Sequence, residues 1–463
     1  MLSNYKSKNT IIYTLALSLI VNLLSSCGAG RAASTGQPRQ QKPPVTEKNA
    51  QTLPVDTVRW TDSGTPPKPK YTPPTDPKKG NGKQPTYAPA GTRHANYKFK
   101  KLEKLDRYNI VIMMPFDAAT FRNIKSASNL QQMAVEFYAG ALIALYDLKS
   151  ENMKLDVHVY DTKIHGLDNL LMTETLRDAD LIIGPLQNED LRKTADFCEH
   201  NNIALVSPLN PNLITKENAA PNYIQVCPTI ETHLESLLKY LDSKYATANF
   251  AVVKGNSEVE GQNLDKVQAA YTRITGKPKM TVIGADEVAN WKTIMGDKGQ
   301  PIVFVPSLRK DFLQSNLPKL SSSDEPVIVG MPGWYEMDWI GSYLGGRTTY
   351  ISRDYLVNKD DEITKDFRKR YFSTYGLMPG ANVYRGYDIM LYSGRMMDEY
   401  GLFFKDFLDD SSLSKDYMTT KFDFKPLKRN PTKPSETTAD THQYENQFMH
   451  VLRYGATGFE KAN

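Results

Sequence analysis

The chain has 463 residues, of which 40% are hydrophobic and 24% are charged, and its formal net charge is +5. This length exceeds what one hydrophobic core usually supports, so more than one folding unit is expected. The charge is uneven: residues 1–27 carry +2, residues 28–107 hold 16 basic and 6 acidic residues, and residues 108–463 are left with −7. Because residues 108–463 carry a negative net charge, the positive charge of the whole chain does not indicate a nucleic-acid-binding function.

The first residues have the pattern of an exported protein. Two lysines lie within the first eight residues, and residues 11–24 are uncharged, mostly apolar and too short for a permanent transmembrane helix. This stretch ends in Leu24-Ser-Ser-Cys27-Gly28, which resembles the bacterial lipobox, where two small residues precede the cysteine that receives the lipid. The resemblance implies a signal peptide over residues 1–26 and lipid attachment at Cys27. An ordinary signal peptide with an incidental cysteine is the alternative.

Residues 27–107 are rich in Pro, Lys and Gln and poor in large apolar residues, which predicts a disordered tether. As a flexible coil the tether would span about 50 Å. No acidic residue lies between Gly28 and Glu47, so neither an inner-membrane retention aspartate nor an acidic surface-export cluster is recognised. We therefore expect the chain at the cell envelope, anchored on the periplasmic face of the outer membrane.

One apolar segment, Leu53-Pro-Val-Asp-Thr-Val-Arg-Trp60, interrupts the tether. Its alternation is typical of a single strand that docks on a sheet edge or on a partner. The alternative is an incidental apolar patch in a linker, because an isolated strand has no stability of its own.

From Tyr108 onward, short apolar runs alternate with amphipathic helical patterns such as residues 133–150, which indicates parallel sheets built from βαβ units. Because two successive half-sheets are too large for one core, two lobes are expected. The predicted strands cover residues 110–114, 155–160, 181–183 and 203–206 in the first series, 250–253, 280–283, 302–305 and 327–329 in the second, and 421–425 and 448–454 in the tail.

Several motifs follow one another in a recognisable order. They are Phe137-Tyr-Ala-Gly-Ala-Leu-Ile-Ala-Leu-Tyr-Asp-Leu148, Asp161-Thr162, Ile183-Gly-Pro-Leu186, Ala204-Leu-Val-Ser-Pro208, Gly330-Met-Pro-Gly-Trp334, Tyr350-Ile-Ser-Arg-Asp354, Phe367-Arg-Lys-Arg-Tyr371 and Tyr384-Arg-Gly-Tyr-Asp388. The ordered set, over about residues 108–400, resembles the type 1 periplasmic binding proteins, the leucine-binding-protein family.

The resemblance implies an α/β body over residues 108–463 with a two-lobed type 1 periplasmic-binding-protein fold, each lobe a mostly parallel sheet flanked by helices. The family's chain crosses between the lobes three times. That pattern assigns about residues 108–226 and 352–400 to lobe one, and about residues 227–351 and 401–463 to lobe two.

Family members that bind amino acids hold the ligand carboxylate with Ser or Thr hydroxyls in lobe one and the ammonium with an acidic residue in lobe two, since a zwitterion needs donors at one end and an anion at the other. This sequence departs from the pattern at all three places. The lobe-one turns are residues 184–189 and 207–212, and Pro332 lies near the expected acid. An amino-acid receptor function is weakened accordingly.

Ten residues at predicted strand ends remain as candidate ligand contacts. Asn and Ser side chains offer hydrogen bonds to sugar-like or peptide-like groups, and the two aromatic side chains offer a stacking face. For each polar residue a helix cap or turn is the alternative, and for the tryptophan it is core packing. The ten are Asp117, Asp161, Asn188, Glu189, Ser207, Asn210, Ser307, Trp334, Tyr335 and Asp354.

No enzymatic motif in the sequence is complete. Ser307-Leu-Arg-Lys310 and Ser412-Leu-Ser-Lys415 both fit Ser-x-x-Lys, but neither has the companion motifs of acyl-serine enzymes. We also find no phosphate-binding loop, zinc signature or nucleophile elbow, so no catalytic residue, cofactor or metal is expected. Cys198 and Cys227 are expected as separate buried thiols, although an oxidising compartment would permit a bridge.

The leading interpretation is therefore a non-catalytic, lipid-anchored periplasmic solute-binding protein of the kind that serves an amino-acid ABC transporter. The alternative is an outer-membrane lipoprotein scaffold or regulator of cell-wall synthesis enzymes that uses the same fold for protein contacts. The expected partners are the membrane, through the N-terminal lipid, and either a small polar solute or an envelope protein, but no nucleic acid.

Overall fold

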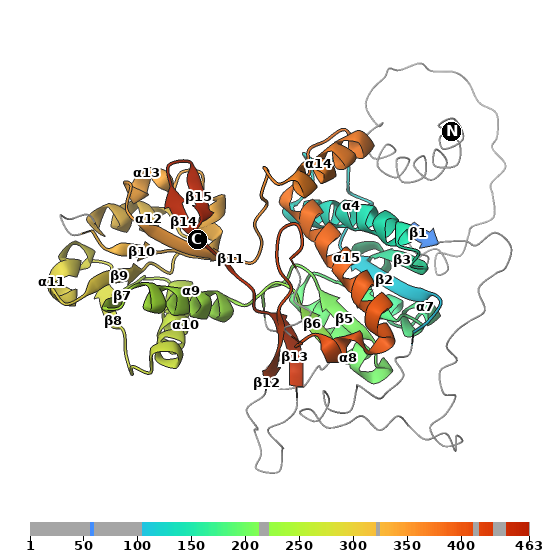
Figure 1. Ribbon diagram of the computed structural model, residues 1–463, viewed down its shortest axis with the longest axis horizontal. Helices are drawn as coiled ribbons and strands as arrows, with labels where there is room; N and C mark the ends of the chain where they lie inside the picture. The colour runs from blue at the N-terminus through green and yellow to red at the C-terminus, as the bar shows by residue number, and fades with distance from the viewer. Residues whose placement is uncertain are drawn as a thin grey trace, which may run out of the picture.

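The computed structural model describes residues 56–59, 104–212, 222–320, 325–410, 416–428 and 441–462. The predicted signal peptide, Cys27 and all of the predicted tether except residues 56–59 and 104–107 lie outside the described residues. The described chain forms two lobes, each with its own sheet, as Figure 1 shows.

The first lobe contains an eight-stranded sheet in the order β1-β3-β2-β4-β5-β6-β13-β12. Strands β2 to β6 are mutually parallel, and β13 continues the parallel set, whereas β1 and β12 pair antiparallel at the two edges. The bounds are β1 Asp56–Arg59, β2 Tyr108–Met114, β3 Leu155–Asp161, β4 Leu181–Ile183, β5 Ala204–Ser207, β6 Tyr223–Gln225, β12 Phe424–Lys428 and β13 Thr441–Asn446.

The second lobe contains a seven-stranded sheet in the order β15-β14-β11-β10-β9-β7-β8. Its first five strands in the chain are parallel, and an antiparallel pair, β14 and β15, closes the edge beside β11. The bounds are β7 Ala248–Lys254, β8 Thr281–Gly284, β9 Gln300–Phe304, β10 Val327–Val329, β11 Thr349–Arg353, β14 His450–Gly455 and β15 Gly458–Lys461.

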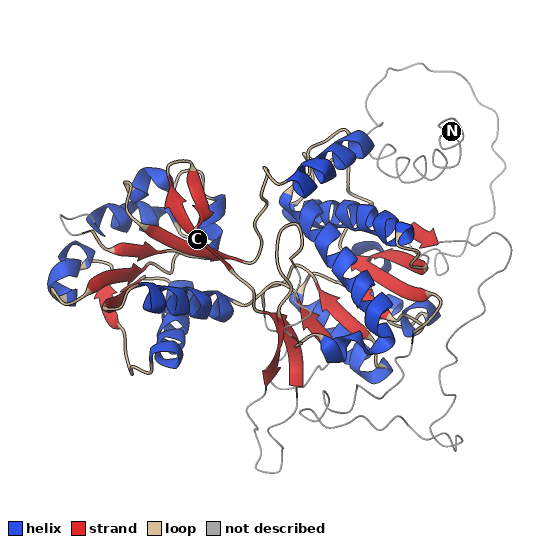
Figure 2. Ribbon diagram, in the orientation of Figure 1, coloured by secondary structure: helices blue, strands red, loops and turns tan. Residues whose placement is uncertain are grey.

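Helices flank both sheets (Figure 2), which explains why the strands are apolar on both faces. In β2, Ile110 and Ile112 pack into the core beneath the two long helices, while Val111 and Met113 pack into a second core on the opposite face. The first lobe's helices are α4 Asn129–Ser150, α5 Thr162–His165, α6 Leu167–Leu170, α7 Glu174–Arg177, α8 Asn188–Asn201, α14 Glu362–Tyr375, α15 Ala381–Tyr400 and η4 Gly401–Phe407.

The second lobe follows the same plan. In β7, Ala251 and Val253 face one core, and Phe250 and Val252 face the other. Its helices are α9 Ile230–Lys244, α10 Glu258–Thr275, η1 Val288–Asn290, α11 Trp291–Met295, α12 Lys310–Asn316, η2 Leu317–Leu320, η3 Pro332–Glu336 and α13 Gly341–Leu344.

Helices α4 and α15 pack closely, with glycines at the contact. A Cβ added at Gly140 would lie 1.8 Å from the carbonyl oxygen of Val383, and one at Gly386 would lie 2.0 Å from that of Phe137. Helix α4 begins at a capping box formed by Ser128 and the backbone and side chain of Gln131. The helix therefore starts four residues before the pattern 133–150 predicted by its apolar periodicity.

The tail departs from its predicted assignment. The sequence places residues 401–463 in lobe two, but η4 adjoins α15, and β12 and β13 extend the first sheet through pairing of β13 with β6. The physical reason is apolar packing, since Phe422, Phe424 and Tyr444 join the core of the first lobe. Among the described residues of this tail, only β14 and β15 belong to the second sheet.

Candidate functional site

The described chain crosses between the lobes three times. Strand β6 leads into α9, β11 leads into α14, and β13 leads into β14 (Figure 1). Since β6 and β11 each enter a crossover at their carboxyl ends, the carboxyl edges of both parallel sheets lie on the crossover side. In open parallel sheets, ligands bind outside this edge.

On lobe one, Asp161 ends β3 and is fully buried. Its carboxylate accepts hydrogen bonds from the backbone N–H groups of Asp117, Ala118 and Lys163, at 3.1, 2.8 and 2.9 Å. Asp117 has a φ of +49° and accepts hydrogen bonds from Thr120. Asp161 therefore organises the loop after β2 and caps α5.

The turns after β4 and β5 are joined by two asparagines. The Asn210 side chain donates to the carbonyl of Leu186 at 2.8 Å and to Oδ1 of Asn188 at 2.7 Å. Ser207 is fully buried, whereas Asn188 and Glu189 are exposed at the start of α8. Of these candidates, Asn188 and Glu189 are the ones a ligand can reach without rearrangement.

On lobe two, Ser307 and Trp334 are buried and bonded to the protein. The Ser307 hydroxyl donates to Glu260 at 2.6 Å and accepts from the backbone N–H of Arg309, while Nε1 of Trp334 donates to the carbonyl of Ser307 at 2.8 Å. Burial alone would raise the pKa of Glu260, but hydrogen bonds from Ser307 and Ser257 lower it. These contacts tie α10 and η3 to the segment after β9.

Three large hydrophobic side chains are exposed at the same edge. Val259, Leu308 and Tyr335 follow β7, β9 and β10, and 65%, 51% and 39% of their side chains are exposed. Leu308 lies beside Gly333, and Val259 is next to Glu260, which contacts Ser307. We call Val259, Leu308 and Tyr335 the lobe-two edge patch.

A charged cluster lies at the crossovers. Arg385 on α15 pairs with Asp354, which follows β11, at 3.0 Å, and the thiol of Cys227, which follows β6, contacts both. The ring of Tyr355 packs against the guanidinium groups of Arg385 and Arg353. Burial alone would raise the pKa of Asp354, but the charges of Arg385, His233 and Arg353 and a backbone hydrogen bond together lower it. Asp354 is therefore occupied by an internal ion pair.

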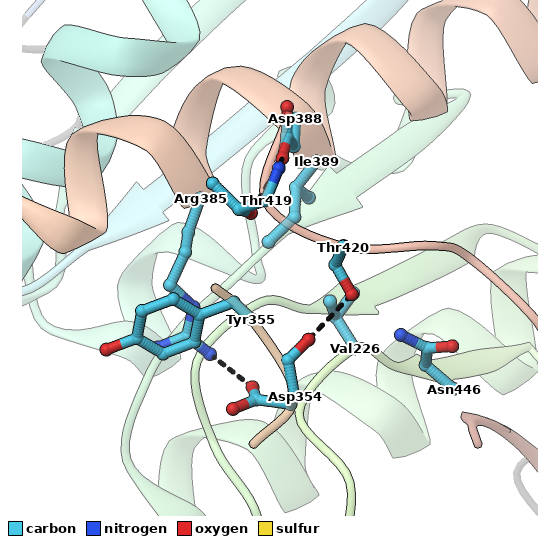
Figure 3. Close-up of a pocket in the computed structure, with 9 residues that line it drawn as sticks. All are labelled: Val226, Asp354, Tyr355, Arg385, Asp388, Ile389, Thr419, Thr420 and Asn446. Atoms are coloured by element: carbon cyan, nitrogen blue, oxygen red, sulfur yellow. Dashed lines mark hydrogen bonds and ion pairs between the residues drawn. The ribbon is translucent and has the colours of Figure 1, made fainter. Parts of the chain in front are cut away.

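A small pocket opens beside this cluster, and Figure 3 shows its lining: Val226, Asp354, Tyr355, Arg385, Asp388, Ile389, Thr419, Thr420 and Asn446. Asp388 accepts hydrogen bonds from the backbone N–H groups of Met418 and Thr419 and from the Thr419 hydroxyl. Burial raises the pKa of Asp388 to about 7. Arg385 and Asp388 were not among the predicted site residues, although two charged residues within the motif Tyr384-Arg-Gly-Tyr-Asp388 were an available signal.

Cys198 and Cys227 are separate buried thiols, as the sequence predicts. Among the described residues, no group of three His, Cys, Asp or Glu side chains is arranged to hold a metal ion. Over the same ranges, no helix combines the length and apolarity needed to cross a membrane.

Two mostly parallel α/β lobes joined by three crossovers define a type 1 periplasmic-binding-protein-like fold, and comparison with solved structures confirms it. A putative branched-chain amino acid ABC transporter protein from Rhodospirillum rubrum has 12% identity and a TM-score of 0.54, over 77% of this chain and 99% of its own. The LpoA C-domain from Haemophilus influenzae, a regulator of PBP1A, has 10% identity and a TM-score of 0.51, over 77% and 100% of the two chains.

An ABC transporter substrate-binding protein from Desulfitobacterium hafniense has 12% identity and a TM-score of 0.50, over 77% and 99% of the two chains. These similar structures are of binding and regulatory proteins, and at such low identity they show the fold alone. No protein-family model matches the chain, and no curated protein matches it.

Proposed function

We propose that this chain is a non-catalytic binding protein of the cell envelope, anchored by lipid at Cys27, whose partner is an envelope protein rather than a free amino acid. One observation carries the proposal. At the carboxyl edges of the two sheets, the side chains of Asp161, Asn210 and Ser307 are bonded inside the protein, while the lobe-two edge patch exposes apolar side chains.

The chemistry of an amino-acid ligand makes this contrast informative. A zwitterion needs free donors on one lobe and a free anion on the other. Ser207 is fully buried, Asn210 is bonded to Leu186 and Asn188, and Asp354 is paired with Arg385. An exposed apolar surface beside polar residues is instead typical of a protein-binding site.

The proposed address is the periplasmic face of the outer membrane, which rests on the residues around Cys27 and on the tether composition. The same fold occurs in a regulator of PBP1A, and this supports a protein-contact role. A cell-wall synthesis enzyme is therefore the class of partner we propose.

A small polar solute is the second candidate. The exposed Asn188 and Glu189 at the start of α8 favour it, because exposed polar side chains at a helix N-terminus offer hydrogen bonds to a ligand.

The test is envelope crosslinking with the full-length chain in its own host. Leu308→Glu combined with Tyr335→Glu should reduce recovery of the crosslinked envelope protein on the order of tenfold or more, because burying a carboxylate in an apolar contact is costly. Met172→Glu is the matched control, since Met172 is 72% exposed on the first lobe away from the patch.

Equal recovery from the patch variant and the control would contradict the proposal. So would a rise in the melting temperature of the wild-type protein with any of the common L-amino acids, because a ligand that binds the native state stabilises it by mass action. That second result would favour the solute-binding candidate.

A further inference from the structure

Strand β1 comes from the predicted tether, yet it pairs with the folded body. Asp56–Arg59 lies antiparallel along β3 in a continuous register that runs from Asp56 opposite Val159 to Arg59 opposite Asp156 (Figure 1). The other edge of β3 is bonded to β2. Without β1, β3 would therefore be the terminal strand of the first sheet.

Strand β3 lacks the features that usually protect a sheet edge. Its seven residues, Leu155–Asp161, contain no lysine and no proline, and Val157 and Val159 are fully buried. Asp156 is bonded to Arg107, and Asp161 is bonded to the loop after β2, so neither is a free charge along the edge. Such an edge accepts an added strand readily unless something covers it.

The covering segment is the strand-like part of an otherwise proline-rich stretch. Residues 53–60 alternate apolar and polar side chains, whereas residues 66–77 include six prolines. Proline cannot donate to a β-ladder, so the flanking sequence is a poor substitute for β1. The residues that pair with β3 therefore lie within the segment whose apolar and polar side chains alternate.

We propose that β1 is a reversible clip that docks the chain's own tether on the edge of β3. If the tether is the flexible coil that its composition predicts, the closed clip leaves an arm of about 30 Å between Cys27 and Asp56, against about 50 Å for the whole released tether. Residues 60–107 then begin and end at the first sheet. Docking does not depend on the lipid, whereas the change of reach rests on the proposed anchoring at Cys27.

The clip is reversible because the free-energy contributions that favour docking and those that oppose it are similar in size. Four residues paired to a single neighbouring strand form few hydrogen bonds, each with a modest net contribution. Fixing four backbone residues and closing the chain between Arg59 and Tyr108 both oppose docking. A small change in conditions or a competing strand therefore shifts the clip between its docked and released states.

The first experiment traps the docked state in the full-length chain. Thr57 and His158 are opposite one another in the register, so Thr57→Cys with His158→Cys should form a disulfide under mild oxidation. The background is Cys27→Ser, since the two remaining cysteines are buried. The control pair is Thr57→Cys with Met378→Cys, because Met378 is 63% exposed elsewhere on the first lobe.

The disulfide between positions 57 and 158 should form at least about tenfold faster than the disulfide of the control pair, because docking raises the effective concentration of the two thiols. Equal rates for the two pairs would overturn the proposal. The experiment needs neither lipid nor partner, so its failure is distinguishable from failure of the proposed function.

Hydrogen exchange provides an independent measurement. Thr57→Pro with Val58→Pro should speed exchange at the amides of β3 that face β1 and leave the alternate amides, bonded to β2, unchanged. Ser63→Pro with Gly64→Pro adds the same number of prolines outside β1 and should change neither set. Identical β3 exchange in wild type and both variants would show that β1 does not dock.

Discussion

Two buried side chains at the crossovers respond to protons in opposite ways. Burial raises the pKa of Asp388 from 3.8 to about 7, so its contribution to stability is lost as pH rises from about 4 to 7. Burial lowers the pKa of His233 from 6.5 to about 4, so its contribution is lost as pH falls from about 6.5 to 4. Between these pH limits, acidification therefore gains stability through Asp388 and loses stability through His233.

Asp388→Asn should therefore make the free energy of unfolding fall more steeply than in wild type when pH is lowered from 7 to 5. The added slope should approach about 1.4 kcal/mol per pH unit where the wild-type carboxyl takes up a full proton on folding. Urea unfolding at pH 5, 6 and 7 measures it.

His233→Gln is the matched variant, and it should reduce the loss of stability on acidification, since it removes the opposing group. Parallel pH profiles for Asp388→Asn and the wild type would contradict the assignment of a raised pKa to Asp388.

At the level of single residues, the sequence indicates which side chains follow strands but not whether they are already bonded. Ser307 and Asp161 lie after or at the end of predicted strands, yet each is committed to a partner that the periodicity cannot reveal. Arg385 was missed because its partner Asp354 lies 31 residues earlier and only the crossover brings them together.

At the level of elements, the contact between α4 and α15 depends on glycine. Gly140→Ala should cost about 3 kcal/mol of unfolding free energy, because the new methyl group would meet the Val383 backbone and force the two helices apart. Gly261 in α10 is the matched control, since no atom lies within 4 Å of its added Cβ. Gly261→Ala should be neutral or stabilise by up to about 1 kcal/mol.

Urea denaturation of both variants measures the difference. If Gly140→Ala were as stable as Gly261→Ala, the close approach of the two helices would not be what Gly140 provides.

Apolar periodicity predicted most strands within a few residues. The predicted strand 110–114 lies within β2, and the predicted strand 280–283 overlaps β8 at residues 281–283. It failed at β13, whose sequence Thr-His-Gln-Tyr-Glu-Asn is polar. Gln443, Glu445 and Asn446 are nonetheless buried, and Glu445 accepts from the Thr229 backbone and the Thr232 hydroxyl at the start of α9. Buried polar strands of this kind leave no apolar signal.

At the level of the whole molecule, the tail joins both lobes. Strand β14 covers the edge of β11, so ending the chain after Gln447 should expose β11 and destabilise the second lobe selectively. Hydrogen exchange should rise in β9, β10 and β11, with little change in β2 and β4. Ending the chain after Gly455 removes β15 but keeps β14, and should have a much smaller effect.

A uniform rise in exchange across both lobes would contradict this division. The two-lobed architecture itself was predictable, because strand and helix patterns repeat in series. The placement of η4, β12 and β13 was not, because it depends on aromatic packing of Phe422 and Phe424 against Tyr392 rather than on chain order.

Helices α4 and α15 pack together but lie far apart in the sequence, and this affects how the chain folds during synthesis. The parallel strands of the second lobe, β7 to β11, lie in one uninterrupted stretch, whereas α4 must wait for a helix that emerges only after that stretch. Contacts between distant segments form slowly because chain entropy must be overcome first. The packing of α4 is therefore expected to mature after the parallel strands of the second sheet have been synthesised, while the edges of both sheets wait for the later strands β12 to β15.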